Sequence, residues 1–177
     1  RLNRCERTAL DCSSLKDTHG PALLVVGHGT GDAQGQAEYQ ALMRRVVRRL
    51  PGVVVEGCFL ELVEPSLPAA LHDLEQRGVR QVIAVPLLLF EAGHAKRDIP
   101  FQAQQAVERG RLQVHVTSAL KSHPRVLELS ARRWHETVGT LNSSPEEQIW
   151  LFVGRGNRDA EATAGFHEFL ARRRELT

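Results

Sequence analysis

The sequence predicts an α/β fold, in which a mostly parallel β-sheet carries helices on both faces. Short apolar runs alternate along the chain with segments whose apolar residues recur at helical spacing. The most apolar run, residues 81–89, is typical of a central parallel strand that is buried on both faces. Ligands of open parallel sheets bind outside the carboxyl ends of the strands, so we look for function in the loops that follow them.

The first half of the chain contains two strand and helix pairs. Residues 22–26 form an apolar run that ends in the glycine-rich loop 27–32, and helical spacing follows from residue 37 until Pro51-Gly52. Valines open a second strand at residues 53–59. Ser66 is a candidate N-cap for the second helix, which Gly78 ends.

The second half continues the alternation. The strand at residues 81–89 is followed by a loop that carries Gly93 and His94, and Pro100 fits the first turn of a helix that reaches about Arg109. Residues 112–116 predict a fourth strand and residues 124–138 a fourth helix. This order implies right-handed crossover connections.

The chain of 177 residues is long enough for one full domain and part of another. Its 23 Lys and Arg against 21 Asp and Glu, with 42% hydrophobic residues, are typical of a globular protein and exclude intrinsic disorder. The basic residues are scattered, so we expect no nucleic-acid partner. No apolar run reaches the roughly 18 residues of a membrane helix. The opening segment lacks the apolar stretch of a signal peptide. We therefore expect no membrane association and a cytoplasmic location, and we take Arg1 to indicate a trimmed start.

The three cysteines are Cys5, Cys12 and Cys58. They show no CxxC spacing, which argues against a disulfide framework and against a structural zinc site. Cys58 lies in a predicted buried strand, where a small core side chain is expected.

The pattern of residues 23–32 returns at residues 150–159, where Trp150-Leu151-Phe152-Val153-Gly154 replaces Leu23-Leu24-Val25-Val26-Gly27. We interpret this as an internal repeat. Together with the composition along the chain, the repeat divides the sequence into a polar segment at 1–20, a domain at 21–141, a linker at 142–147, and the first strand and helix of a second copy at 148–177. Arg155 stands where the first copy has His28. Since a guanidinium has no acceptor lone pair, the second copy should not bind a metal ion.

Three residues at the predicted strand ends could carry chemistry. His28 and His94 lie in glycine-flanked loops at one sheet edge, and Glu61 follows the second strand among apolar neighbours, or is simply a solvent-facing residue at a strand tip. Two imidazoles and one carboxylate suit a borderline ion such as Co²⁺, Fe²⁺ or Ni²⁺ and leave coordination positions open. The remaining histidines that we interpret as exposed polar residues are His19, His72, His115, His135 and His167.

Three motifs in order carry a resemblance to a known family: Gly27-His28-Gly29, the segment Phe59-Leu60-Glu61-Leu62, and the long run from Pro86 to Pro100 (PLLLFEAGHAKRDIP). Together they resemble the sirohydrochlorin chelatases of the CbiX and SirB type, which are class II metal chelatases. The resemblance runs from about residue 21 to 140 and includes Ser122-His123-Pro124. With the repeat, it resembles the amino-terminal part of the long, two-repeat form.

The resemblance implies a chelatase-like, flavodoxin-like fold and a lyase that inserts a divalent metal, usually cobalt, into sirohydrochlorin without ATP. The metal is then a substrate, and no cofactor is permanently bound. The family's two histidines fall on His28 and His94 and its acidic residue on Glu61. The histidine that acts as base is left open between the two.

The substrate carries many carboxylates, so its pocket should offer cations, helix N-termini and an apolar floor. Lys96 and Arg97 are the expected cations, and Phe90 is the expected floor. Backbone N–H groups at predicted helix starts could bind further carboxylates; these are Thr30, Gly31 and Ser66.

Other functions remain open at this point. His28-Gly29-Thr30 resembles the start of a histidine phosphatase, although Gly27 stands where that superfamily has its phosphate-binding arginine. A carrier that binds metal or tetrapyrrole without insertion is a second alternative. A nucleotide binder that uses the 27–31 loop is a third, although no Lys-Ser or Lys-Thr pair follows as in a P-loop. The expected assembly is a homodimer, or completion by the rest of a second repeat.

One prediction needs only the sequence. His94→Ala should abolish metal insertion and leave the fold intact, because it removes a ligand from a loop, whereas Arg155→Ala should leave insertion unchanged. An insertion assay that follows the absorbance of the macrocycle, with circular dichroism as the fold control, measures both. Normal turnover by a folded His94→Ala protein would contradict the proposed ligand set.

Overall fold

The computed structural model describes residues 20–90, 94–140, 144, 149–154, 156 and 158–176, and of residues 94–96 and 106–109 it describes only the backbone. Four parallel strands form one sheet in the order β2-β1-β3-β4. The strands are β1 (Ala22–Gly27), β2 (Val55–Phe59), β3 (Gln81–Pro86) and β4 (Gln113–Val116).

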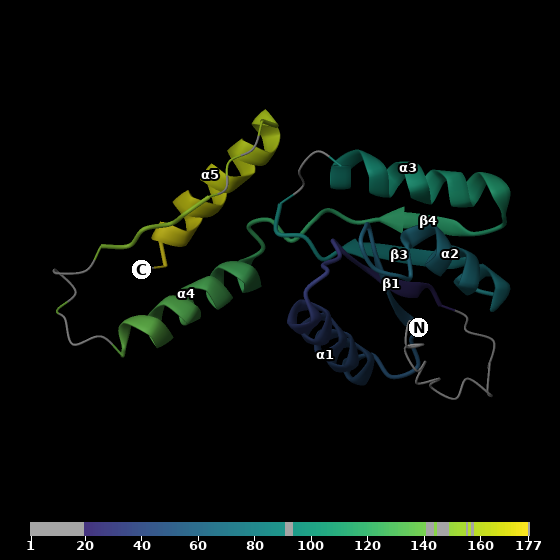
Figure 1. Ribbon diagram of the computed structural model, residues 1–177, viewed down its shortest axis with the longest axis horizontal. Coiled ribbons are helices and arrows are strands. Elements are labelled where there is room, and N and C mark those ends of the chain that lie inside the picture. The colour runs from purple at the N-terminus through teal and green to yellow at the C-terminus, as the bar shows by residue number, and fades with distance from the viewer. Residues whose placement is uncertain are drawn as a thin grey trace.

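Helices lie on both faces of the sheet, as predicted (Figure 1). The helix α1 (Ala33–Arg49) covers one face, and α2 (Leu67–Gln76) and α3 (His94–Arg109) cover the other. Two further helices, α4 (Pro124–Val138) and α5 (Ala160–Arg174), pack together beside the sheet, on the side toward which the strands point. Within the described ranges, no helix has both the length and the apolar character that a membrane span needs.

The main core lies between the sheet and the pair α2 and α3. Leu24 and Val26 of β1 are fully buried there, together with leucines of α2 and Ile99 of α3. In β4 the apolar residues Val114 and Val116 pack against this core. The alternation of buried and exposed residues along the strands therefore fixes which face each side chain joins.

The carboxyl ends of three strands meet at one edge because β1 lies between β2 and β3. Gly27 pairs with Phe59 of β2, and Val26 pairs with Pro86 of β3. Backbone hydrogen bonds continue past the strand ends: Leu60 donates to the Gly27 carbonyl at 3.0 Å, and Leu87 donates to the Val26 carbonyl at 2.8 Å. The three connections that follow therefore leave the sheet side by side.

Two helices begin earlier than the sequence predicted. The first, α1, begins at Ala33 rather than residue 37, because Asp32 is its N-cap and accepts a hydrogen bond from the Gly35 N–H at 2.7 Å. The helix α3 begins at His94 and continues through Pro100, which was expected in the first turn. Proline removes a single backbone donor there. His94 is thus the first residue of a helix and not part of a loop.

The strand β3 is shorter than predicted and ends at Pro86 instead of Leu89. Proline has no N–H to continue a hydrogen-bonded ladder, which explains the end of the strand. The other predicted elements lie close to their expected positions, and α4 occupies the predicted residues 124–138.

The second copy forms its helix but not its strand. The described residues 149–154 form no β-strand, although β1 was the template for that prediction. The strand β1 has a hydrogen-bonded neighbour on each side, and an isolated strand without such neighbours is not stable. The helix α5 begins as α1 does: Asp159 caps it and accepts from the Glu161 N–H at 2.9 Å. Arg155 and, apart from Ser144, the predicted linker 142–147 lie outside the described residues.

Aromatic side chains join α4, α5 and the segment 149–154. The ring centroids of Trp134 and Trp150 lie 5.4 Å apart, and the Phe152 ring packs against two phenylalanines of α5. Arg173 is fully buried, lies 4.5 Å over the Trp150 ring, and donates from Nε to the Ser130 hydroxyl at 3.2 Å. Burial lowers the pKa of the Arg173 guanidinium. This aromatic packing accounts for the departure of α4 from the sheet.

Cys58 is a core residue, as predicted. It is fully buried in β2, and burial raises the pKa of its thiol to about 12. The thiol therefore stays protonated near neutral pH and is a poor metal ligand. Cys5 and Cys12 lie outside the described residues.

Candidate functional site

The described part of the site is a pair formed by His28 and Glu61. His28 follows β1 and Glu61 follows β2, and the Glu61 N–H donates to the His28 carbonyl at 3.1 Å. The side chains also meet, with His28 Nε2 3.2 Å from Glu61 Oε1. Their side chains are 61% and 57% exposed, so both groups are open to an ion from solvent. The structure thus brings together two of the three predicted ligands.

A glycine lets the two loops approach closely. Gly29 has φ of +99°, and a Cβ there would overlap the backbone carbonyl oxygen of Glu61. A residue with a side chain would push the loop after β1 away from the loop after β2. Gly29 therefore holds His28 and Glu61 in register.

Two aromatic rings pack together at the ends of β1 and β2. The Tyr39 ring of α1 lies 4.5 Å from the Phe59 ring, and its hydroxyl donates to the Val25 carbonyl at 2.9 Å. A Cβ at Gly27 would lie 3.0 Å from the Tyr39 ring, so the ring closes directly over the end of β1. Burial, followed by the nearby Cys58, raises the pKa of the Tyr39 phenol, which keeps it neutral. The phenol acts here as a fixed donor.

The loop that carries Glu61 folds back onto the end of β2. Leu62 has φ of 67°, the Glu64–Pro65 peptide is cis, and the Phe59 N–H donates to the Pro65 carbonyl at 2.9 Å. Ser66 is the N-cap residue of α2, as predicted, but its side chain makes no capping bond. The loop is therefore anchored at both ends, with Glu61 exposed between them.

One of the three predicted anion-binding backbone groups, that of Ser66, already has a partner within the protein, and the other two adjoin a carboxylate. The Ser66 N–H donates to the Glu64 carboxylate at 2.6 Å. Thr30 and Gly31 precede the N-cap Asp32, whose carboxylate occupies the start of α1. A carboxylate of a ligand would have to compete with Glu64 or Asp32 at these positions, and the predicted binding there stays a prediction.

The remaining predicted residues lie at the start of α3, except Phe90, which precedes this helix by four residues. The side chains of His94 and Lys96 fall outside the described residues, while Arg97 is exposed in the first turn. Phe90, the expected floor, packs edge to face against two rings of α5. That contact with the second copy was not anticipated; the phenylalanines of α5 were the only signal in the sequence.

The chemistry of this edge is that of an open, weakly filled metal site. One imidazole nitrogen and one carboxylate oxygen suit borderline divalent ions. Among the side chains that the structure describes, no group of three His, Cys, Asp or Glu could hold a metal ion. A third ligand would have to come from outside this set, and His94, the first residue of α3, follows the neighbouring strand β3 in the chain.

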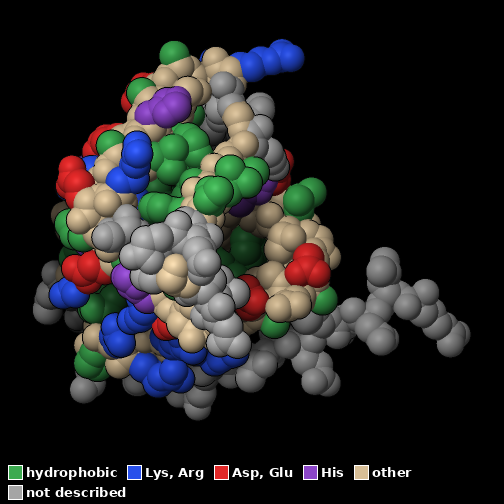
Figure 2. Space-filling view, turned by 90° about the vertical axis from the view of Figure 1, so that its left-hand side faces the viewer, with side chains coloured by type: hydrophobic (Ala, Val, Ile, Leu, Met, Phe, Trp, Pro, Cys, Tyr) green, Lys and Arg blue, Asp and Glu red, His purple; other side chains and the backbone are tan. Residues whose placement is uncertain are grey.

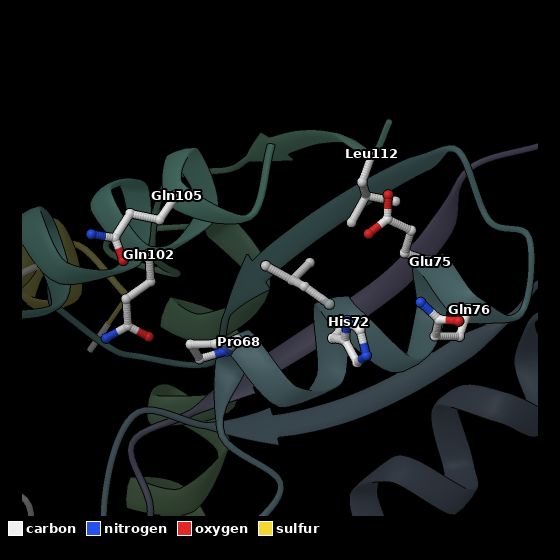
Figure 3. Close-up of a pocket in the computed structure, with 8 residues that line it drawn as sticks. Pro68, His72, Glu75, Gln76, Gln102, Gln105 and Leu112 are labelled. Atoms are coloured by element: carbon white, nitrogen blue, oxygen red, sulfur yellow. The ribbon is translucent and has the colours of Figure 1, made fainter. Parts of the chain in front are cut away.

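A separate pocket of about 480 Å³ lies between α2 and α3 (Figure 3). It is lined by Pro68, Leu71, His72, Glu75, Gln76, Gln102, Gln105 and Leu112. None of these residues was predicted for the site. Glu75 accepts a hydrogen bond from the Arg111 N–H at 2.7 Å, which ties α2 to the start of the β4 region. The predicted chemistry therefore does not lie in this pocket.

Comparison with known proteins finds a CbiX family model that matches residues 22–137. The sirohydrochlorin ferrochelatase of Priestia megaterium is 30% identical over 148 residues, which cover 83% of this chain and 54% of the relative. The sirohydrochlorin cobaltochelatase of the same organism is 28% identical over 152 residues, with 83% and 48% covered. The chain thus spans about half the length of these two relatives.

A solved structure agrees over more of the chain than the family model covers. SirB from Bacillus subtilis with Fe3+ superposes with a TM-score of 0.78 at 25% identity. The match covers 89% of this chain and 61% of that one. The likeness of the folds therefore extends beyond the residues that the family model matches.

Gly29→Ala should lower the free energy of unfolding by about 2 kcal/mol or more, since a side chain at positive φ adds strain of roughly 1–3 kcal/mol. The overlap with the Glu61 carbonyl adds to this cost. Gly31→Ala is the matched control in the same loop, because a Cβ there meets nothing within 4 Å. Urea denaturation measures both. Equal stability of the two variants would show that the close approach of the loops is not needed.

Proposed function

The chain belongs to the CbiX family, and on this premise we propose that it inserts a divalent metal ion into sirohydrochlorin without ATP. The observation that carries the proposal is the contact of 3.2 Å between His28 Nε2 and Glu61 Oε1 at the carboxyl edge of the sheet. The order β2-β1-β3 supports it, because Glu61, His28 and His94 follow three adjacent strands. Adjacent strands lie about 4.8 Å apart, which brings their connections within reach of one ion.

In the proposed reaction, His28, Glu61 and His94 present the ion to one face of the macrocycle. Insertion releases two pyrrole protons while the ion loses water, and the macrocycle nitrogens replace the protein ligands. A base must accept the protons, and we assign that role to His28 or His94. Incomplete coordination by the protein favours release, since a structural site would fill every position.

The start of α3 supports recognition of an anionic substrate. Arg97 is exposed there, and with Lys96 it would pair with carboxylates at the rim of the macrocycle. Phe90 remains our proposal for the apolar floor, at the margin of the aromatic group of α5. Figure 2 looks onto the end of the molecule where α4 and α5 lie, and hydrophobic side chains gather in the middle of that face.

We propose Co²⁺ as the first candidate for the inserted ion. We propose the cytoplasm as the location of the protein. Relatives of this chain are named as both ferrochelatase and cobaltochelatase. The affinity order of first-row ions is set largely by the ions themselves, so an imidazole and carboxylate site accepts several of them. Fe²⁺ and Ni²⁺ therefore belong in the same assay.

We also propose that further polypeptide completes the second repeat. Ile149, Leu151 and Val153 are 92%, 80% and 80% exposed, while Trp150 and Phe152 between them pack inward. Leu151 and Val153 correspond in the repeat to Leu24 and Val26, which are fully buried. The exposed face is thus the one that a complete unit covers, and in this chain on its own a second copy would cover it.

His28→Ala should lower the rate of metal insertion by at least tenfold, because loss of even an outer partner of a metal ligand costs about 10- to 100-fold. His72→Ala is the control, an exposed histidine that lines the separate pocket. The assay mixes protein, Co²⁺ and sirohydrochlorin and follows the absorbance of the macrocycle. Binding of one equivalent without turnover by the unaltered chain would favour the carrier instead. Equal loss in both variants would remove the proposed site.

The molar mass from light scattering should rise toward that of a dimer as the protein concentration increases, because the apolar face of residues 149–153 is exposed in the single chain. Leu151→Asp should keep the chain monomeric. Phe101→Asp, at an apolar residue of α3 that is 59% exposed, should not. A chain that stays monomeric at every concentration would rule out a second copy as the cover.

A further inference from the structure

Phe90 joins the first unit to the helix of the second copy. Its ring centroid lies 5.9 Å from those of both Phe166 and Phe169, with interplanar angles of 75° and 88°. Such edge-to-face contacts have a defined geometry and fix the position of a ring. Phe166 and Phe169 are three residues apart on α5 and share one face of the helix. Phe90 stands four residues before His94, so α5 contacts the connection that leads to a predicted ligand.

The same connection is held on its other sides by backbone hydrogen bonds. Leu120 donates to the Leu88 carbonyl at 2.9 Å, and Lys121 donates to the Leu89 carbonyl at 2.8 Å. Leu87 donates to the Val26 carbonyl of β1. Residues 87–90 are thus fixed by β1, by the loop after β4 and by the rings of α5.

The two rings of α5 are themselves firmly seated. Phe169 is 2% exposed, and Phe152 lies 5.7 Å from Phe166 and 5.8 Å from Phe169. A Cβ at Gly154 would lie 2.7 Å from the Phe166 ring, so glycine is needed for this contact. The aromatic face of α5 is therefore a rigid surface against which Phe90 packs.

The corresponding contact in the first copy supports a specific role for Phe166. In the repeat, Phe166 corresponds to Tyr39 and Gly154 to Gly27, and in each copy the ring closes over the glycine. Tyr39 then packs against Phe59 of its own unit, whereas Phe166 packs against Phe90 of the other unit. The ring of the second copy therefore contacts the first unit as well as Phe152 of its own unit.

We propose that Phe166 and Phe169 of α5 are positioning residues for the metal site: they hold Phe90 and with it residues 87–90, which follow β3 and precede His94 in the chain. The inference rests on the proposed function only where it concerns the metal. It gives the second copy a role although Arg155 stands where the first copy has its histidine: α5 would fix residues 87–90 of the first copy, ahead of His94.

The test compares Phe90→Ala, Phe166→Ala and the double variant with Trp134→Ala. Trp134 contacts Trp150 in the same aromatic packing but not Phe90, so it reports general loosening of α4 and α5. Two quantities are measured: hydrogen exchange of the Leu120 and Lys121 amides, and the affinity for Co²⁺ from its visible absorption on titration. If Phe166→Ala does not fold, Phe166→Leu takes its place.

Phe90→Ala and Phe166→Ala should each weaken Co²⁺ binding by about tenfold or more and speed exchange of both amides. The double variant should bind no more weakly than Phe90→Ala, because Phe166 acts on the site only through Phe90, which that variant has already lost. Trp134→Ala should stay within about twofold of the unaltered chain. Unchanged amide exchange in Phe90→Ala, additive effects, or an equal loss in Trp134→Ala would each overturn the inference. If the amides respond as expected but even the unaltered chain binds no Co²⁺, the positioning role stands and the proposed function fails.

Discussion

The parallel pairing of β1 between β2 and β3 is the constraint on which the site depends. Gly27 pairs with Phe59 on one side, and Val26 pairs with Pro86 on the other. Since hydrogen bonds continue for one or two residues beyond the strands, each connection starts in a fixed register with its neighbour. A shift of one residue in either ladder would turn the following side chains to the opposite face. The contact between His28 and Glu61 is therefore set by the sheet before either side chain interacts.

The pair itself contributes little to the stability of the fold. Both side chains are more than half exposed, and ion pairs between exposed groups are worth about 0–1 kcal/mol at most sites. The surrounding loop is nevertheless closely built, with a positive φ at Gly29 and at Leu62. Glycine adopts a positive φ readily, so only Leu62 carries strain here, of about 1–2 kcal/mol. Under the proposed function, this loop geometry serves binding rather than stability. An exposed, incomplete ligand set is also what a metal ion needs if it is to enter and leave.

Periodicity in the sequence was sufficient for the sheet and for most helix positions. The β1 run, the α4 residues and the glycine loop after Gly27 all carry local signals, and each was predicted near its observed position. Two kinds of feature could not be predicted. Helix starts depended on caps such as Asp32, and the partner of α4 depended on aromatic contacts between distant residues. Periodicity shows which face of an element is apolar, but it does not identify the neighbour that covers that face.

The two segments that we interpret as copies share one local arrangement with different surroundings. Each copy places a glycine beneath a ring of the following helix and caps that helix with an aspartate. In the first copy the ring is Tyr39, whose hydroxyl bonds the β1 backbone and whose position supports the His28 loop. In the second copy the ring is Phe166, which has no hydroxyl to bond a strand, and the described residues 149–154 before it form no strand. Without strand neighbours, the segment 149–154 and α5 gain their stability from contacts with α4 and Phe90. The aromatic rings of α5 thus form a surface that packs against Phe90 of the first unit, close in sequence to the start of α3.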